Sequence, residues 1–211
     1  MMKLPTVNVL ISEFDKGLRT LLAQPRSLRA HPDADIAETT LTDIEKKHAS
    51  ALMRVNHTGE VCAQALYSGQ ALTARRPETT AALKHAAQEE TEHLAWCETR
   101  ISQLGGRTSI LNPIFYAGSF TMGVVAGAFG DKWNLGFVAE TEKQVETHLA
   151  GHLDKLPKND QKTRKIIEQM QTDEAKHADQ ARQQGATELP KPAKILMKQI
   201  SKLMTTSSYY L

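Results

Sequence analysis

Hydrophobic residues recur every three or four positions along most of the chain. This spacing places them on one face of an α-helix and is typical of amphipathic helices that pack around a shared core. Prolines, glycines and capping residues interrupt the pattern and mark where the predicted helices begin and end. The predicted helices cover residues 8–24, 42–76, 77–104, 113–130, 133–156 and 160–184, and a last amphipathic segment follows Pro192. The pattern therefore predicts an all-α fold.

The chain is predicted to consist of two parts that meet near residue 40. Residues 1–40 comprise the short N-terminal helix and an arm at 25–40, where two prolines disfavour a helix. Residues 41–211 form the main domain, whose first helix begins at Thr42 with Glu45 in the spacing of a capping box. That helix is expected to run to Arg76, because a proline follows and opens the next helix.

Glutamates interrupt three of the hydrophobic rows in the main domain. Glu90, Glu142 and Glu174 each occupy a position in a row that is otherwise apolar. An isolated ionised carboxylate in such a place costs several kcal/mol unless another group compensates it, and a shared metal pair would compensate all three. Glu89 and Glu92 lie outside the row that contains Glu90 and are predicted to be solvated charges.

The motif Glu-x-x-His at residues 90–93 recurs at residues 174–177, and each of these two copies has an acidic candidate in the preceding helix. Because residues three apart share a helix face, each copy offers one oxygen and one nitrogen ligand to a metal ion. One upstream candidate, Glu60, lies at the edge of the apolar face of its helix, so periodicity alone leaves its burial open. The candidate metal-ligand set is Glu60, Glu90, His93, Glu142, Glu174 and His177.

Ferritin-like di-iron carboxylate proteins carry this ligand pattern inside a four-helix bundle, with a Glu from each of two helices and a Glu-x-x-His from each of the other two. The chain is thus predicted to form a ferritin-like four-helix bundle with additional N- and C-terminal amphipathic helices. Carboxylate and imidazole ligands suit iron or manganese better than structural zinc. Because carboxylates bridge two ions and change their binding mode, the set favours a di-iron centre that activates dioxygen.

Composition changes this picture little. With 211 residues, of which 40% are hydrophobic, the chain has the size of a single domain with a substantial core. The formal net charge of +2 gives no electrostatic case for binding nucleic acid. Cys62 and Cys97 are predicted to be buried thiols in a reducing compartment. The first residues contain no apolar run of signal-peptide length, which favours a position on the cytosolic side.

Two apolar segments each have two interpretations. Residues 114–130 carry no charge and contain Gly123 and Gly127 in a Gly-x-x-x-Gly motif, but they are barely long enough to span a bilayer. They are predicted to form a closely packed helix, or else an apolar wall for a hydrophobic substrate or a shallow membrane contact. The segment after Pro192 is either a helix packed on the bundle with a solvated lysine face or a helix that docks onto anionic lipid. Its apolar side carries Leu196, Ile200 and Leu203, and its other side carries Lys191, Lys194, Lys198 and Lys202.

Several motifs resemble those of the demethoxyubiquinone hydroxylases, the di-iron monooxygenases of ubiquinone biosynthesis. The resemblance covers roughly residues 40–211, and its first-helix signature is Arg-Val-Asn-His-Thr-Gly-Glu-Val at 54–61. It continues through both Glu-x-x-His motifs, the glycine-rich segment, residues 138–142 with His148 beyond them, and residues 204–210. The resemblance implies that the six candidate ligands hold two irons. His148 is either an outer residue that orients a ligand or a histidine on the helix surface.

The resemblance further implies that dioxygen hydroxylates the ring of a polyprenylated 3-methyl-6-methoxy-1,4-benzoquinol, with electrons from a reduced nicotinamide or from the quinol. The chain contains no Gly-x-Gly-x-x-Gly fingerprint of a dinucleotide site. A peripheral location on the cytoplasmic side of the cell membrane, contacts with other ubiquinone-biosynthesis proteins and no nucleic-acid partner are expected. Two alternatives stay open: a ferritin-like iron-storage or ferroxidase protein, and a di-iron hydroxylase of another substrate such as tRNA.

Overall fold

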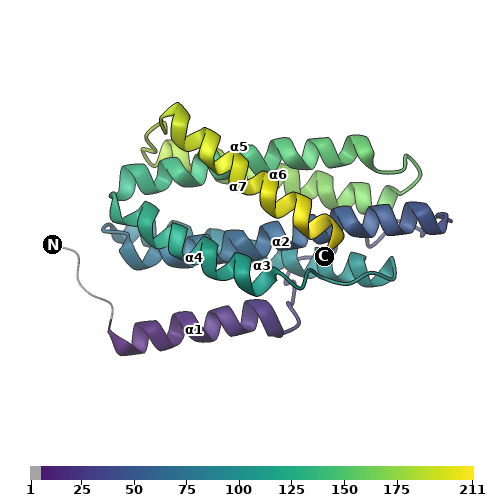
Figure 1. The fold of residues 1–211 in the computed structure, drawn as a ribbon, viewed down its shortest axis with the longest axis horizontal. Coiled ribbons are helices and arrows are strands. Elements are labelled where there is room, and N and C mark those ends of the chain that lie inside the picture. Colours follow the sequence, from purple (N-terminus) through teal and green to yellow (C-terminus); the bar gives the residue numbers. More distant parts are fainter. Residues whose placement is uncertain (1–5) are drawn as a thin grey trace.

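The computed structural model describes residues 6–211, and α-helices are the regular secondary structure throughout that range (Figure 1). α2 packs against α3 and α5 packs against α6, so the bundle consists of two helical hairpins. The predicted all-α fold with a four-helix bundle is confirmed. The bundle helices are α2 (Asp43–Thr73), α3 (Pro77–Gln103), α5 (Asp131–Lys155) and α6 (Gln161–Gln183).

Local signals place the helix ends close to the predicted positions. Thr42 and Glu45 form the predicted capping box: the Thr42 hydroxyl accepts a hydrogen bond from the Glu45 N–H at 3.3 Å, and the Glu45 carboxylate accepts one from the Thr42 N–H at 2.8 Å. α2 ends at Thr73 and does not reach Arg76 as predicted. The carboxylate of Asp131 accepts hydrogen bonds from two backbone N–H groups of the connection to α3, and it holds this connection in an extended conformation.

Two hydrophobic core clusters lie along the bundle with the inward glutamates between them, and a third joins α2 and α3 to residues 112–128. In α3, Ala86 belongs to one cluster and Trp96 to the other, and Glu90 lies between the two in sequence. In α6, Met170 and Ala181 flank the inward glutamate in the same way. Apolar packing on both sides therefore holds the four bundle helices in register around the candidate site.

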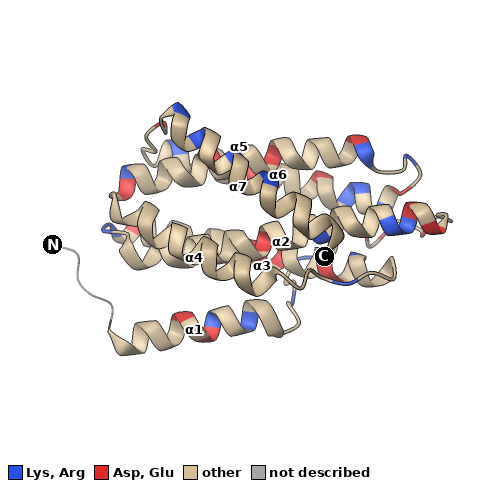
Figure 2. Cartoon of the chain, in the orientation of Figure 1, with Lys and Arg blue, Asp and Glu red and all other residues tan. Residues whose placement is uncertain are grey.

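Helix α4 (Asn112–Ala128) connects the two hairpins and packs along α2. Small residues allow a close approach: a Cβ atom at Gly69 or at Gly123 would lie 2.2 Å from a backbone oxygen of the other helix. The prediction of a closely packed helix is confirmed for this face. The opposite face is apolar and exposed, with Ile114 at 70% exposure, and Figure 2 shows α4 without charged residues.

Helix α1 (Val7–Leu22) lies on the outside of the bundle, and residues 23–41, called the arm below, lead from it to α2 (Figure 1). The fully buried Arg100 of α3 fixes the arm, because it donates hydrogen bonds to Glu38 at 2.6 and 3.1 Å and to Asp160 of the bundle at 2.9 Å. The division of the chain near residue 40 stays a prediction. None of the helices in the described part of the chain is long and apolar enough to cross a membrane.

Helix α7 (Lys191–Tyr210) lies across α2 and α5 on the outside of the bundle (Figure 1). The predicted packing on the bundle and the solvent exposure of the lysines hold for Lys191, Lys198 and Lys202, but the helix does not pack through its leucine row. Leu196 and Leu203 are 61% and 69% exposed, so much of the apolar side faces outward. Lys194 pairs with Glu140 of α5 at 3.4 Å, which turns one edge of the lysine side toward the bundle.

Candidate metal centre

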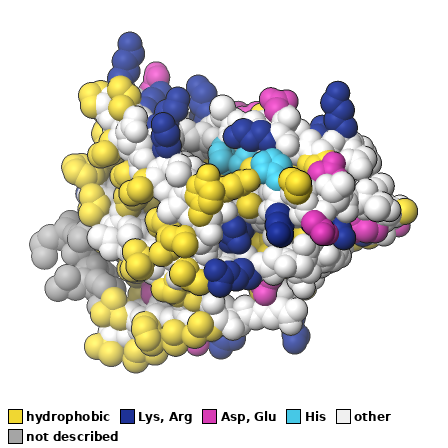
Figure 3. Space-filling model, turned by 45° about the vertical axis from the view of Figure 1, so that its right-hand side comes forward, with side chains coloured by type: hydrophobic (Ala, Val, Ile, Leu, Met, Phe, Trp, Pro, Cys, Tyr) yellow, Lys and Arg dark blue, Asp and Glu magenta, His cyan; other side chains and the backbone are white. Residues whose placement is uncertain are grey.

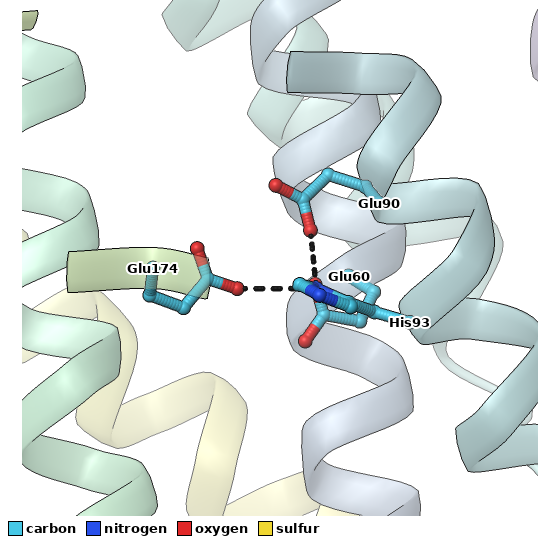
Figure 4. A group of neighbouring side chains, drawn as sticks. All are labelled: Glu60, Glu90, His93 and Glu174. Carbon is cyan, nitrogen blue, oxygen red and sulfur yellow. Dashed lines mark hydrogen bonds and ion pairs between the residues drawn. The ribbon is translucent and has the colours of Figure 1, made fainter. Parts of the chain in front are cut away.

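The six predicted ligands converge inside the bundle, with one or two contributed by each of its helices. Two groups of four side chains each offer ligand atoms that all lie within 4.8 Å of one another. Glu90 and Glu174 belong to both groups, whereas the other members are specific to one. The first group is Glu60, Glu90, His93 and Glu174, drawn in Figure 4, and the second is Glu90, Glu142, Glu174 and His177. The arrangement is that of two neighbouring cation positions with two shared carboxylates.

Each histidine turns the same ring nitrogen toward the carboxylates. His93 Nδ1 lies 3.0 Å from Glu90, 3.3 Å from Glu174 and 3.8 Å from Glu60, and Figure 4 shows these side chains pointing toward one another. His177 Nδ1 lies 3.3 Å from Glu174 and 3.5 Å from Glu90. Glu60, which periodicity left open, is 3% exposed and points inward.

The other ring nitrogen of each histidine contacts a carboxylate outside the cluster. His93 Nε2 lies 3.4 Å from Asp173, and His177 Nε2 lies 2.8 Å from Glu89. Such outer partners fix the tautomer and the orientation of a ligating imidazole. The prediction that Glu89 is a solvated charge is therefore wrong. The sequence contains a signal for both outer groups: an acidic residue directly precedes the glutamate in the Glu-x-x-His motifs at residues 90–93 and 174–177.

Glu92 is also not the solvated charge that was predicted. It is 5% exposed, and its carboxylate accepts hydrogen bonds from the backbone N–H of Leu28 at 2.9 and 3.0 Å and of Arg29 at 3.2 Å, and also contacts the Ser27 hydroxyl. The helix period predicts only that Glu92 faces away from the bundle axis. It cannot show that the arm folds over this face and buries the carboxylate.

Burial controls the protonation of the cluster. Removal from water raises the pKa of Glu60 and of Glu142 well above the usual value for a glutamate, and neighbouring carboxylates add to this effect. Burial would also raise the pKa of Glu174, but hydrogen bonds from His177 and His93 outweigh it and hold that pKa low. Burial would lower the pKa of His177, but the carboxylates raise it to about 9. The metal-free cluster therefore retains protons at neutral pH, and these protons must leave when a cation binds.

The residues present fit a pair of divalent cations. The Oε1 atoms of Glu90 and Glu142 are buried, and neither has a hydrogen-bond partner within the described residues. Buried carboxylate oxygens normally have such partners, so these two atoms are placed for a ligand that the protein itself does not supply. Two cations would also neutralise four carboxylates that have been removed from water. Cys62 and Cys97 are free thiols, and neither belongs to the cluster. Cys97 is buried, as predicted, whereas Cys62 is only partly buried.

An apolar cavity of about 140 Å³ lies between α2, α4, α5 and α7. A smaller hollow adjoins it, since the two share Gly59, Gln144 and Met204, and this hollow reaches Glu60. Hydrophobic side chains from all four helices line the larger cavity, among them Leu66, Phe115, Met122, Phe137, Val145 and Met197. The glycine-rich segment thus contributes one wall of an apolar cavity as well as a closely packed face. Its contact with a hydrophobic substrate or a membrane stays a prediction.

His148 lines the hollow that contains Glu60. Its ring lies 4.0 Å from that of His152, and burial together with Lys155 lowers the pKa of His148 to about 4. Its Nε2 is buried and accepts or donates no hydrogen bond among the described residues. His148 is therefore a partly buried, neutral imidazole in the wall of this hollow, and its role as an outer residue that orients a ligand stays a prediction.

A helical bundle that encloses two overlapping carboxylate and histidine sets defines the class of this protein: it is a ferritin-like helical protein with a candidate two-metal centre. The family model described as "Ubiquinone biosynthesis protein COQ7" matches residues 47–208, and the chain belongs to this family. The resemblance found in the sequence is thereby confirmed.

The sequence is similar to proteins with curated names, and the similarity covers nearly the whole chain. A protein of Chromobacterium violaceum is 62% identical over 200 residues, which cover 95% of this chain and 97% of the relative. Relatives from Laribacter hongkongensis and Nitrosomonas europaea are 59% and 57% identical, over 96% and 97% of this chain and 98% of each relative. All three are named 3-demethoxyubiquinol 3-hydroxylase.

Proposed function

We propose that this chain is a 3-demethoxyubiquinol 3-hydroxylase, which uses dioxygen to hydroxylate the ring of a polyprenylated 3-methyl-6-methoxy-1,4-benzoquinol. The observation that carries the proposal is the pair of ligand sets that share Glu90 and Glu174, next to an apolar cavity. Membership of the family and the names of its relatives support the same reaction. The site would hold two irons, with Glu60 and His93 completing one position and Glu142 and His177 the other.

The iron pair, when bound, supplies the oxidising chemistry: one oxygen atom of dioxygen enters the ring, and the other leaves as water with two electrons and two protons. A reduced nicotinamide or the quinol supplies the electrons. The protein positions the metal ligands and keeps water away from the reacting groups. Glu90 and Glu174 reach both metal positions, and the outer carboxylates Asp173 and Glu89 fix the two imidazoles. His148 lines the hollow as a neutral imidazole, and its buried Nε2, which has no partner among the described residues, can form a hydrogen bond with a hydroxyl group of the quinol.

The cavity suits a substrate with a hydrophobic tail. Its walls are mainly apolar, and it narrows toward Glu60 through a hollow that also contains the polar side chains of Gln144 and Ser201. A polyprenyl tail would lie in the apolar part, because burial of each CH₂ group contributes about 0.8 kcal/mol. The quinol ring would then lie at the polar end, next to the metal centre.

Quinone profiling in cells that lack the gene tests the reaction. These cells are expected to accumulate the demethoxy precursor and to lose ubiquinone during aerobic growth. A gene copy with Glu174→Ala should not restore ubiquinone, and the purified variant should contain less iron. Glu168→Ala is the matched control, since this glutamate lies on the same helix and is exposed. Normal ubiquinone in the deletion strain, with no second hydroxylase present, would exclude the proposed reaction.

The enzyme reaches its lipid substrate as a peripheral protein on the cytoplasmic side of the cell membrane. Exposed hydrophobic side chains on α1, α4 and α7 support this location, and Figure 3 shows hydrophobic side chains gathered over one side of the molecule. The exposed hydrophobic side chains of these helices include Phe14, Ile114, Leu196 and Leu203. The same surface contacts other ubiquinone-biosynthesis proteins, and the protein has no nucleic-acid partner.

Binding to anionic vesicles tests the location. Replacing the exposed Lys191, Lys198 and Lys202 by glutamate should weaken binding by roughly two decades, because each lysine near an anionic surface contributes about 1 kcal/mol. Lys194 is left unchanged, since it pairs with Glu140 and Glu188 within the protein. Glutamate at Lys46, Lys158 and Lys165, exposed lysines at other places, is the control. Equal sedimentation of both variants with the vesicles would exclude a role of the lysines of α7.

A further inference from the structure

The arm covers one side of the metal centre through a short, well-anchored segment. Ser27, Leu28 and Arg29 all contact the buried carboxylate of Glu92, and the indole N–H of Trp96 donates a hydrogen bond to the Ser27 hydroxyl at 3.2 Å. Glu92 and Trp96 flank the ligand His93 in α3. The anchored segment is therefore held against the part of α3 that carries this ligand.

Arg29 contacts two groups that in turn contact His93. Its Nη1 donates a hydrogen bond to Asp173 Oδ2 at 2.9 Å, and the same oxygen lies 3.4 Å from His93 Nε2. The guanidinium carbon also lies 4.6 Å from the centroid of Trp96, whose ring is 5.3 Å from the ring of His93. Asp173 accepts further hydrogen bonds from Gln169 and Lys176, both at 3.1 Å. The orientation of His93 is thus fixed from two directions by a residue far away in sequence.

The second histidine has the same kind of outer partner in a more open environment. Glu89, which contacts His177 Nε2 at 2.8 Å, has a side chain that is 28% exposed, whereas the side chain of Asp173 is 3% exposed. The other partner of Glu89 is the imidazole of His85, whose side chain is 71% exposed. Water can therefore compete for the outer partner of His177, but hardly for that of His93.

We propose that Arg29 is a positioning residue of the metal centre: acting through Asp173, it holds His93 so that the metal at the His93 position is retained longer than the metal at the His177 position. The proposal rests on the proposed function, because it assumes that the six ligands hold two metals. Residues outside the bundle would then determine which of the two positions loses its metal first.

Release of ferrous iron to a coloured chelator under anaerobic conditions tests this proposal. The full-length protein loaded with two irons should release them in two phases of about one iron each, and His177→Gln should remove the fast phase. Arg29→Gln should accelerate the slow phase by about 10- to 100-fold, the usual effect of losing an outer partner on metal affinity. Arg29→Lys, which keeps a positively charged donor for Asp173, should restore part of the slow phase.

Two controls separate positioning from folding. Arg26→Gln changes an exposed arginine of the same arm and should release iron as the parent protein does. Asp173→Asn should accelerate the slow phase like Arg29→Gln, and thermal unfolding followed by circular dichroism shows whether either variant remains folded at the assay temperature. Parental release from folded Arg29→Gln or from folded Asp173→Asn overturns the proposal, as does a single release phase in the parent protein. Failure of the parent protein to bind two irons overturns the proposed metal pair instead.

Discussion

Replacing Gly123 by alanine tests how α4 is fixed on the bundle. A Cβ atom at this position would lie 2.2 Å from the carbonyl oxygen of Leu66 and 3.1 Å from the backbone nitrogen of Gln70. Carbon atoms in a packed interior prefer separations of roughly 3.5–4.0 Å, so α4 and α2 would have to move apart by roughly 1 Å. Both opposing atoms belong to the backbone and cannot turn away. Such overpacking typically costs about 1–3 kcal/mol, which exceeds the roughly 0.5–1 kcal/mol that alanine contributes over glycine within a helix.

Urea unfolding followed by circular dichroism measures this effect, with Gly118→Ala as the matched control. Gly118 lies in the same helix, and a Cβ atom there would meet no atom within 4 Å. The control should therefore be more stable than the parent protein by roughly 0.5–1 kcal/mol, whereas Gly123→Ala should be less stable. Met122 lines the apolar cavity, so Gly123→Ala should also weaken substrate binding. Equal stability of the two variants would refute the argument from close packing.

Two further predictions concern the groups around the metal centre. Glu92→Ala should destabilise the protein by roughly 1–3 kcal/mol, because backbone N–H groups of the arm lose their charged acceptor, whereas the exposed Glu168→Ala should be close to neutral in the same urea experiment. In the metal-free protein, the melting temperature should fall between pH 6.5 and 9. His177, with its pKa raised from 6.5 to about 9, is protonated in the folded protein and loses this proton over that range, which removes up to about 3 kcal/mol of stability. The raised pKa of Glu60 acts in the same direction, and a melting temperature that stays constant or rises would contradict this sign.

The periodic pattern was sufficient to predict the burial of the candidate ligands that lie in an apolar row, but not the burial of Glu60. Glu90, Glu142 and Glu174 follow from periodicity because each is the only polar residue in its row. α2 is packed against α3, α4 and α7, so it has no single buried face whose edge could be read from the sequence. Glu60 is nearly fully buried for this reason, although it lies beside the apolar row of its helix.

The periodic pattern could not predict the burial of polar residues whose partners are distant in the sequence. Glu92 is buried by the arm, and Lys194 is turned inward by a carboxylate of α5. Each of these partners is more than 50 residues away in the sequence. Hydrophobic periodicity carries no information about contacts over such distances. Such contacts depend on how irregular segments and whole helices pack, which propensity and periodicity do not determine.

The repeated motif is in fact one residue longer than Glu-x-x-His, and its two copies are interdependent. An acidic residue precedes the ligand glutamate in both copies, as Asp173 and as Glu89. Asp173, from the second hairpin, contacts His93 of the first, and Glu89, from the first, contacts His177 of the second. Each hairpin therefore supplies the outer partner for the histidine of the other, so neither can orient its own ligand before the two hairpins pack together. The candidate metal centre is accordingly complete only in the assembled bundle, and metal binding should stabilise the packing of the two hairpins more than it stabilises either hairpin alone.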